Sequence, residues 1–152
     1  GYYLLNNRYN SINLAYMQNC RANSSLCTTK EEQIADMVYA NHTRRRVLEV
    51  CENELNELAK REERGKTMPE DNKEMQVQRM YNNEQKFWIY VNKAEAHFAL
   101  GEFEESKQAI ALAKLIDHKP WMMESFEEQQ AKLRVLLERN GHLLNPPWKE
   151  PV

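Results

Sequence analysis

Apolar residues recur every three or four positions along most of the chain, which is the spacing of one face of an α-helix. The first such stretch covers residues 10–22, and the second runs from Lys30 to Arg64. In the second, the apolar stripe lapses between Asn41 and Arg46, which leaves room for a kink or an exposed stretch. No stretch alternates between apolar and polar residues as a half-buried strand does. The pattern predicts an all-α fold.

Helical patterns also occupy most of the second half of the chain. They cover residues 73–100 and 102–116, and a last one starts at Pro120 and stops near Gly141. Between the two halves, the charged stretch KREERGKTMPEDNKE resembles a linker over about residues 61–74. The sequence therefore predicts a helical domain over residues 1–142. A proline-containing tail of residues 143–152 follows it, which we expect to be extended and docked through Leu143, Leu144 and Trp148.

Several residues mark where these helices begin and end. Thr28 with Glu31, or Thr29 with Glu32, forms a capping box ahead of the second helix. Each internal glycine falls where a helical pattern breaks, as expected for helix ends: Gly65, Gly101 and Gly141. Pro120 suits the first position of a helix, where its missing N–H costs nothing.

Composition and charge narrow the function. The 152 residues suit one domain, and a net charge of −2 gives no general attraction to nucleic acid or anionic lipid. No apolar run approaches the roughly 18 residues needed to span a membrane. Three cysteines without metal-like spacing indicate a reducing compartment, so we expect a cytoplasmic protein. The chain has no glycine-rich loop that would hold a phosphate, which excludes P-loop and Rossmann sites.

The segment KAEAHFALGEFEESKQAIALAKLIDHKP, residues 93–120, resembles one tetratricopeptide repeat (TPR). Gly101 takes the turn between the two helices, and small or aromatic residues take the family's packing positions: Ala94, Phe103, Ser106 and Ala113. Lys93 departs from the usual leucine, and Pro120 arrives about two residues late. The resemblance implies antiparallel helical hairpins stacked as a short right-handed solenoid.

A second resemblance covers more of the chain. RYNSINLAYM, residues 8–17, followed by Trp88 and the run from Ala94 to Gly101, resembles the TRAFs-binding domain family. The matching residues are Tyr9, Ile12, Asn13, Trp88, Ala94, Glu95, Ala96 and Gly101, while Ser11 stands where glycine is usual. That family is a TPR-like regulatory region of apoptosis-signal-regulating kinase kinase kinases and of bacterial proteins. The resemblance implies a protein-interaction segment of a larger protein, without chemistry of its own.

In a TPR the inner face of the first helix meets the ligand. The alignment places on that face five candidate partner-binding residues: Trp88, Val91, Glu95, Phe98 and Glu102. Val91 and Glu95 stand where chaperone-binding repeats carry a lysine and an asparagine, which argues against a carboxylate clamp. An apolar or basic ligand fits better, with Glu95 and Glu102 as ion partners. The competing interpretation, which we favour for Trp88 and Phe98, is that both aromatics are core.

Other clusters favour ordinary roles. Arg44, Arg45 and Arg46 are interpreted as a solvated helix face balanced by three glutamates, Glu49, Glu52 and Glu54. An imagined zinc set of Cys20, Cys27, His42 and Cys51 fits no known ligand spacing. We predict no metal, no cofactor and no enzymatic activity.

The sequence favours a non-enzymatic module that binds a protein, a peptide or another domain of its own chain. One alternative is a structural or oligomerisation domain without a dedicated ligand. Another is an enzyme whose site joins residues distant in sequence, such as His42 with Glu49. The sequence names neither the partner nor the oligomeric state.

Overall fold

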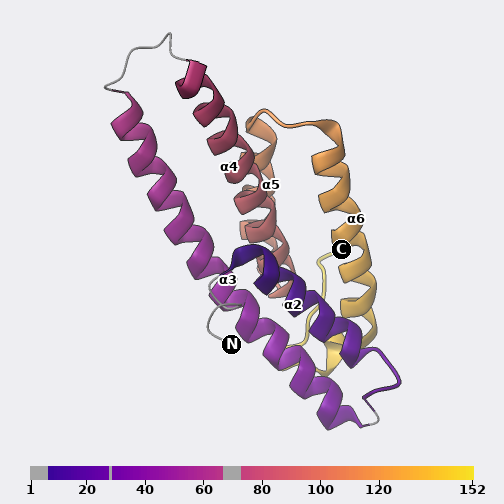
Figure 1. The fold of residues 1–152 in the computed structure, drawn as a ribbon. Coiled ribbons are helices and arrows are strands. Elements are labelled where there is room, and N and C mark those ends of the chain that lie inside the picture. Colours follow the sequence, from indigo (N-terminus) through magenta and orange to yellow (C-terminus); the bar gives the residue numbers. More distant parts are fainter. Residues whose placement is uncertain (1–6, 28, 67–72) are drawn as a thin grey trace.

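The computed structural model describes residues 7–27, 29–66 and 73–152, and these fold into five α-helices and one short 3₁₀ helix (Figure 1). The elements are α2 (Arg8–Ala22), α3 (Lys30–Gly65), α4 (Lys73–Ala99), α5 (Phe103–Leu115), α6 (Pro120–Asn140) and η1 (Gly141–Leu143). These described residues contain no strand, so the predicted all-α class is confirmed. None of the described helices combines the length and the apolar character needed to cross a membrane.

The predicted helix ends agree with the structure. The Thr29 hydroxyl accepts a hydrogen bond from the Glu32 N–H at 3.2 Å and caps α3, while Thr28 lies outside the described residues. Gly101 has a φ of 79° in the turn between α4 and α5, a conformation that glycine adopts without the strain of a Cβ. Pro120 is the first residue of α6.

Helix α3 continues without interruption through residues 41–46, where the apolar stripe lapses. Thr43 and Arg44 occupy the buried positions of this stretch, between Ala40 and Val47. The buried face of α3 therefore continues through the stretch, but with polar instead of apolar side chains. The helices also extend into the predicted linker from both sides. Helix α3 ends at Gly65 and α4 begins at Lys73, and residues 67–72 lie outside the described range.

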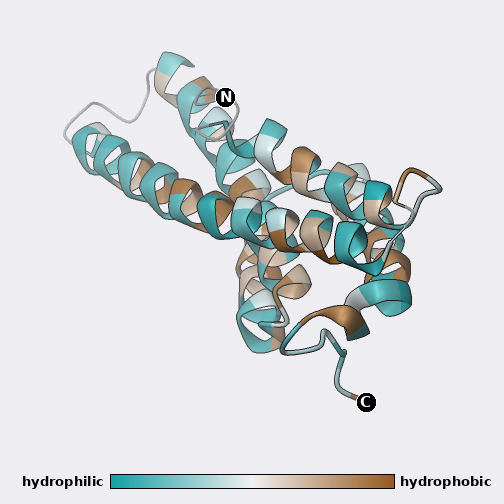
Figure 2. Cartoon of the chain, turned by 90° about the horizontal axis from the view of Figure 1, so that it is seen from below, coloured by the Kyte–Doolittle hydropathy of each residue, from teal (hydrophilic) through white to brown (hydrophobic). Residues whose placement is uncertain are grey.

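Consecutive long helices pack side by side. Helix α2 lies along α3, α3 along α4, and α4 along α5, each running back against its predecessor (Figure 1). Helix α6 then contacts both α4 and α2. Figure 2 shows that hydrophobic and hydrophilic residues are interspersed along the long helices. Helix α4 therefore has neighbours on several sides and is the centre of the fold.

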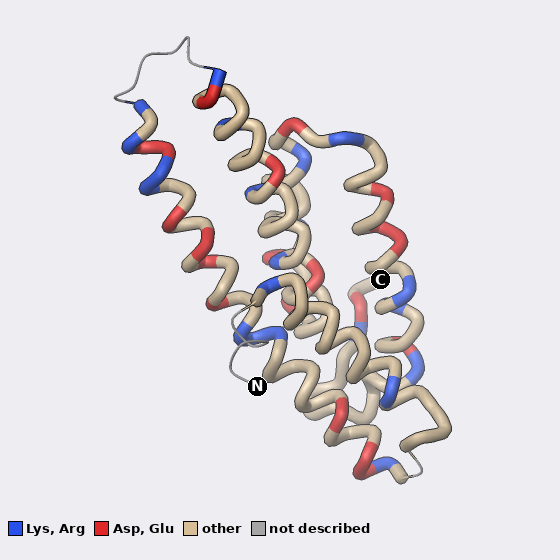
Figure 3. The backbone as a smooth tube through the Cα atoms, in the orientation of Figure 1, with Lys and Arg blue, Asp and Glu red and all other residues tan. Residues whose placement is uncertain are grey.

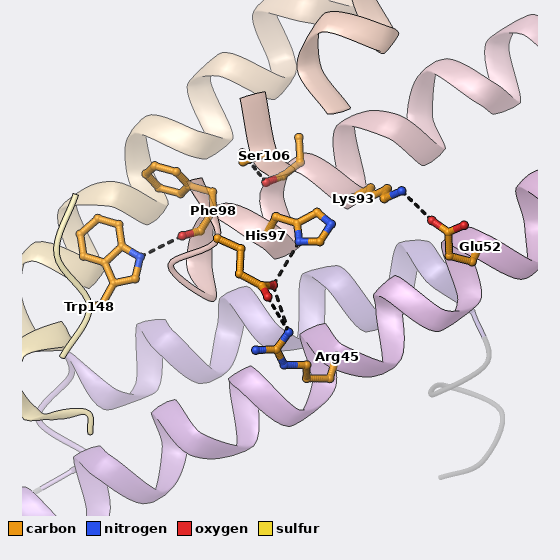
Figure 4. A network of polar contacts seen from close by, with 9 residues as sticks. Arg45, Glu52, Lys93, His97, Phe98, Ser106 and Trp148 are labelled. Carbon is orange, nitrogen blue, oxygen red and sulfur yellow. Dashed lines mark hydrogen bonds and ion pairs between the residues drawn. The ribbon is translucent and has the colours of Figure 1, made fainter. Parts of the chain in front are cut away.

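Three clusters of buried residues fill the spaces between the helices. The first joins α4, α5 and α6 through Phe87, Val91, Ala94, Ala109, Ala113, Met122 and Phe126. The second joins α2, α3 and α4 through Ile12, Val47, Cys51, Leu58, Ile89 and Ala96. At the α4–α5 crossing, the Ser106 hydroxyl donates a hydrogen bond of 2.8 Å to the Ala94 carbonyl, so both predicted small residues lie at a close approach (Figure 4).

The third cluster includes the C-terminal tail and consists of Phe98, Ala99, Leu133, Leu137 and Trp148. The Trp148 indole is only 7 % exposed, and its N–H donates a 2.9 Å hydrogen bond to the Phe98 carbonyl at the end of α4 (Figure 4). Arg134 of α6 and Glu150 form an ion pair at 2.7 Å. The tail is therefore docked, as expected, with Trp148 as its main anchor and Leu144 packed against the same cluster.

Candidate partner-binding groove

A groove of about 460 Å³ lies between α2 and α6, with α4 at its base. Helix α2 contributes Arg8, Tyr9, Ile12 and Asn13, α4 contributes Trp88, Val91, Asn92 and Glu95, and α6 contributes Ser125, Phe126, Glu128, Gln129 and Lys132. Val91 and Glu95 are buried, whereas Tyr9, Glu128 and Lys132 are exposed. The α4 side chains are therefore the floor, and the exposed side chains of α2 and α6 are the rims.

The floor comes from one face of α4. Trp88, Val91 and Glu95 are three and four residues apart, which places them on the same side of a helix. Opposite faces of α4 are occupied by its neighbours: Phe87 and Ala94 pack towards α5 and α6, and Ile89 and Ala96 pack towards α2 and α3. The face between them borders the groove, and its Val91 and Trp88 also contact the cluster between α4, α5 and α6.

Trp88 joins the groove to the core. It is partly buried and packs against the cluster between α4, α5 and α6. Its ring centroid lies 5.3 Å from that of Phe87 and 6.0 Å from that of Trp121, which is 57 % exposed. Trp88 is therefore both a core contact and part of the groove surface, while Trp121 extends the aromatic surface outwards.

Side-chain hydrogen bonds attach each end of α2 to the neighbouring helices. The Arg8 guanidinium donates to a Glu54 carboxylate oxygen of α3 at 3.1 Å and also to the Asn92 side chain of α4. At the other end of α2, the Asn140 side-chain amide of α6 donates to the Ala22 carbonyl at 3.3 Å and to the Asn23 side chain at 3.0 Å. Both ends of α2 are thus fixed, and the groove lies between these two attachments.

Beneath the floor, Glu95 shares a buried region with Arg44 of α3. Arg44 is 0 % exposed and Glu95 is 4 % exposed. In the described part of the chain, none of the three Arg44 guanidinium nitrogens has a hydrogen-bond partner, and neither has Oε2 of Glu95. The two charges attract each other without a direct hydrogen bond, so their polar atoms remain unsatisfied.

The prediction that Arg44 lies on a solvated face was wrong. Residues three, four and seven apart from it on α3, namely Val47, Ala40 and Cys51, are also buried, so its helical position is a core position. Its neighbours do face outwards: Arg45 pairs with Glu102 at 3.0 Å and Arg46 with Glu49 at 2.6 Å. The spacing of Arg44 from apolar residues was a signal in the sequence, but the adjacent arginines concealed it.

Burial dominates the electrostatics of this pair. It raises the pKa of the Glu95 carboxyl to about 7, although the Arg44 charge acts in the opposite direction. It also lowers the pKa of the Arg44 guanidinium to about 10, and here the Glu95 charge opposes the shift. Because low-dielectric surroundings disfavour a charged group, both charges are costly to maintain.

A residue of α2 adds to the unsatisfied groups. Asn19 is 1 % exposed, and its side-chain oxygen also lacks a partner among the described residues. Tyr16, one turn earlier, has a raised pKa, first because of burial and then because of Cys20 and the charge of Glu95. Each buried polar atom without a partner costs about 1–3 kcal/mol, so α2, α3 and α4 each carry a buried polar group that the described residues leave unsatisfied.

The structure places the other two predicted partner-binding residues elsewhere. Phe98 is 3 % exposed and packs edge-to-face on Phe103 and Trp148, with centroids 5.8 and 5.4 Å away. Glu102 accepts hydrogen bonds of 3.0 and 3.1 Å from Arg45 and lies 3.1 Å from the His97 ring (Figure 4). The structure therefore brings Trp88, Val91 and Glu95 together and leaves Phe98 in the core and Glu102 in a satisfied ion cluster.

The other chemical candidates do not converge. Among the described residues, no group of three or more His, Cys, Asp or Glu side chains is arranged to hold a metal ion. Cys51 is buried in the α2–α3–α4 cluster, and burial raises the pKa of its thiol to about 12. Cys27 donates to Asp36 at 3.1 Å. His42 is exposed, and Glu49 pairs with Arg46.

Comparison of the chain with known proteins gave no match among protein-family models, curated proteins or solved structures. The resemblance to the TRAFs-binding domain family stays a prediction from its motifs. The function is therefore inferred from the geometry of the groove.

Proposed function

We propose that this chain is a protein-interaction module that holds a peptide segment, or another domain of its own chain, in the groove between α2, α4 and α6. The observation that carries the proposal is the gathering of Trp88, Val91 and Glu95 on the floor of one groove, where the Glu95 carboxyl keeps an acceptor without a partner. A floor of this kind offers apolar contact and one buried polar group, which is the usual make-up of a binding site.

The order of the helices supports a TPR-like arrangement. The pairs α2–α3 and α4–α5 run back on themselves, α6 follows, and the groove is lined by the first helix of each pair and by α6. A short solenoid would use this inner surface for its ligand. A regulatory place in a larger signalling protein, which the family resemblance implies, and a cytoplasmic location, which the cysteines indicate, belong to the same proposal.

Selection from a random peptide library displayed on phage tests this function, because such a library samples ligands of many sequences. The immobilised wild-type chain should retain peptides that Trp88→Ala and Glu128→Lys release, while Leu112→Ala, on exposed α5 surface, retains them. Circular dichroism must show equal helicity in all four proteins. Peptides that bind the two groove variants as tightly as the wild type would overturn the proposal.

A structural role is the second candidate, and one surface favours it. Met17, Leu26 and Tyr39 are 60, 73 and 62 % exposed, and they line a shallow cleft between α2 and α3. Exposed apolar clusters commonly mark contacts with other protein surfaces. If this role holds, light scattering should find an oligomer that Met17→Lys and Tyr39→Lys dissociate, and a monomer at all concentrations would count against it.

A further inference from the structure

The groove floor continues along α4 beyond the groove itself. Val77, Met80 and Tyr81 are 66, 70 and 52 % exposed, and their spacing of three and four places them on one face of the helix. Trp88 lies on the same face, seven residues after Tyr81 and eleven after Val77. Figure 1 shows that the first turns of α4 extend beyond α5 and α6. Among the described residues, helix α4 thus carries exposed apolar side chains on the face that leads into the groove, interrupted by Glu84 between Tyr81 and Trp88.

The length and size of this surface suit a helical ligand. From Val77 to Trp88, α4 rises by about 16 Å, or roughly three turns. The groove volume of about 460 Å³ is close to that of one turn of a helix of 10–12 Å diameter, on the order of 500 Å³. A ligand helix therefore fits along this face of α4 with its last turn in the groove, in the manner of helix-in-groove recognition.

Beside the groove, the exposed charged side chains without a partner among the described residues are mainly acidic, whereas the start of α4 also has cations nearby, such as Arg61 and Arg79. Glu84 lies on α4 one turn before Trp88, and Glu124 and Glu128 lie on exposed α6, where Figure 3 shows acidic positions in its first half. None of the three has a hydrogen bond or ion pair with another described residue. Of the cations that line the groove, Arg8 is held by Glu54 and Asn92, which leaves Lys132. The rim therefore favours a positively charged partner.

Glu95 supplies a second and independent reason to expect a cation. Glu95 is only 4 % exposed and lines the groove. Its Oε2 atom accepts no hydrogen bond. Arg44 favours the ionised carboxylate but makes no hydrogen bond with it, so Oε2, which is itself enclosed, lacks a donor. A carboxylate has about four acceptor sites, and a Lys or Arg side chain would fill them.

We propose that the groove binds a basic amphipathic helix, whose apolar side lies along Val77, Met80, Tyr81 and Trp88 and from which one Lys or Arg side chain reaches Glu95. This inference rests on the proposed function and names the partner class. The acidic rim steers and orients the helix, and the Glu95 carboxylate anchors it at the groove floor.

Three designed 14-residue amphipathic helices test the inference: one of Leu and Lys, one of Leu and Gln, and one of Leu and Glu. The ¹⁵N-labelled chain has three indole N–H signals, of which Trp148 is hydrogen-bonded in the core and serves as an internal reference. The Leu/Lys peptide should shift the Trp88 and Trp121 signals and leave Trp148 in place. We expect it to bind at least tenfold more tightly than the Leu/Gln peptide.

Variants then separate the contribution of the groove floor to peptide binding from that of the rim. Glu95→Gln should weaken the Leu/Lys peptide about tenfold or more, and Glu128→Lys should weaken it several-fold with a reduced salt dependence. Glu105→Gln, on exposed α5 surface, is the matched control and should change nothing. Because Glu128 is exposed, its variant keeps the test decisive if Glu95→Gln unfolds.

Each other outcome overturns the inference in a distinguishable way. If the Leu/Gln or Leu/Glu peptide shifts Trp88 and Trp121 as strongly as the Leu/Lys peptide, the groove binds helices but not basic ones, and the proposed function survives. If Glu95→Gln folds and binds like the wild type, Glu95 is not the anchor. If none of the three peptides shifts these signals, the basic-helix inference fails, and the phage selection decides the proposed function separately.

Discussion

Glu95 and Glu102 lie on either side of the end of α4 and meet opposite surroundings. Glu95, at the groove floor, is almost fully buried, Oε2 has no partner in the described residues, and burial raises its pKa to about 7. Burial also acts to raise the pKa of Glu102, but hydrogen bonds with His97 and Arg45 outweigh it and hold that pKa below its ordinary value. The Glu102 carboxylate accepts hydrogen bonds from neighbouring side chains, whereas Oε2 of Glu95 accepts none.

This difference separates a structural carboxylate from one available to a ligand. Glu102 ties the α4–α5 turn to Arg45 of α3, and any ligand would have to displace those donors. Glu95 has only an electrostatic attraction to Arg44, so a ligand's cation would have no existing hydrogen bond to displace from Oε2. Glu102 is the more exposed of the two carboxylates. Whether a carboxylate is free to bind a ligand therefore depends more on whether its hydrogen bonds are already made than on its exposure.

Arg44→Met tests the buried carboxyl of this comparison, Glu95, because it removes the neighbouring positive charge. At pH 8, where Glu95 is mainly ionised in the wild type, the substitution removes the charge that lowers its pKa, so Glu95 must take up a proton to stay buried, and we expect a loss of about 1–2 kcal/mol more than at pH 5 in the free energy of unfolding. At pH 5 Glu95 is protonated, so the loss should be small or absent. Urea unfolding at both pH values measures this, and Arg45→Met, half exposed in its pair with Glu102, should cost no more than about 1 kcal/mol.

The double variant Arg44→Met/Glu95→Leu sharpens the result. It removes both buried charges and should recover most of the wild-type stability, because well-packed apolar residues often replace a buried ion pair without loss. Equal losses for Arg44→Met at pH 5 and pH 8 would show that the guanidinium contributes by packing alone.

Glu95→Gln should change how stability depends on pH. Because the folded pKa of about 7 is above the ordinary value of 4.5, the folded state binds the proton more tightly than the unfolded state. The stabilisation is complete below about pH 4.5 and is lost as the pH rises through 7, by up to about 3 kcal/mol. The variant should lack this decline. Parallel curves for both proteins between pH 4.5 and 8 would contradict the raised pKa.

The sequence predicted the helices well because their signals are local. Thr29, Pro120 and Gly101 each fix a boundary by their own backbone or capping chemistry, and the structure has each of them at the expected end. The α4 spacing likewise placed Trp88, Val91 and Glu95 on one face, and these three line one groove.

The features that could not be predicted from the sequence depend on which helix packs against which face of its neighbour. The spacing of Phe98 favoured a core position, which the structure confirms, but only the fold shows that Trp148, fifty residues later, is what packs on it. The burial of Arg44 depends on α2 and α4 lying across α3, and three consecutive arginines suggested a solvated face instead. Such tertiary coverage leaves no mark on a single helical pattern, which is why Glu102 and Arg44 were not separated from their neighbours.

Gly101→Ala tests the turn that places Glu102 beside Arg45. An alanine there would have a φ of 79°, which costs an L-residue about 1–2 kcal/mol, although its Cβ would lie 4.0 Å from the nearest Trp148 atom and would not clash. Gly65→Ala is the control, since Gly65 is the last helical residue of α3 and its Cβ would meet only the flexible end of Met75, at 3.2 Å. Thermal unfolding should show a lower midpoint for Gly101→Ala alone, and equal midpoints would argue against strain at the turn.

Glu102→Gln should have the smallest effect and the opposite pH dependence to Glu95→Gln. Because the folded pKa of Glu102 is below the ordinary 4.5, its contribution is present above that pH and is lost as the pH falls through the folded pKa. The ion cluster is about one third exposed at Glu102, so solvent screens it and we expect a loss within about 1 kcal/mol at pH 7. Urea unfolding of the wild type and Glu102→Gln should differ at pH 7 and converge as the pH falls through the lowered folded pKa of Glu102. If Glu102→Gln instead matched the wild type at pH 7 and diverged from it in acid, Glu102 would share the environment of Glu95, and filled acceptors would no longer distinguish the two carboxyls.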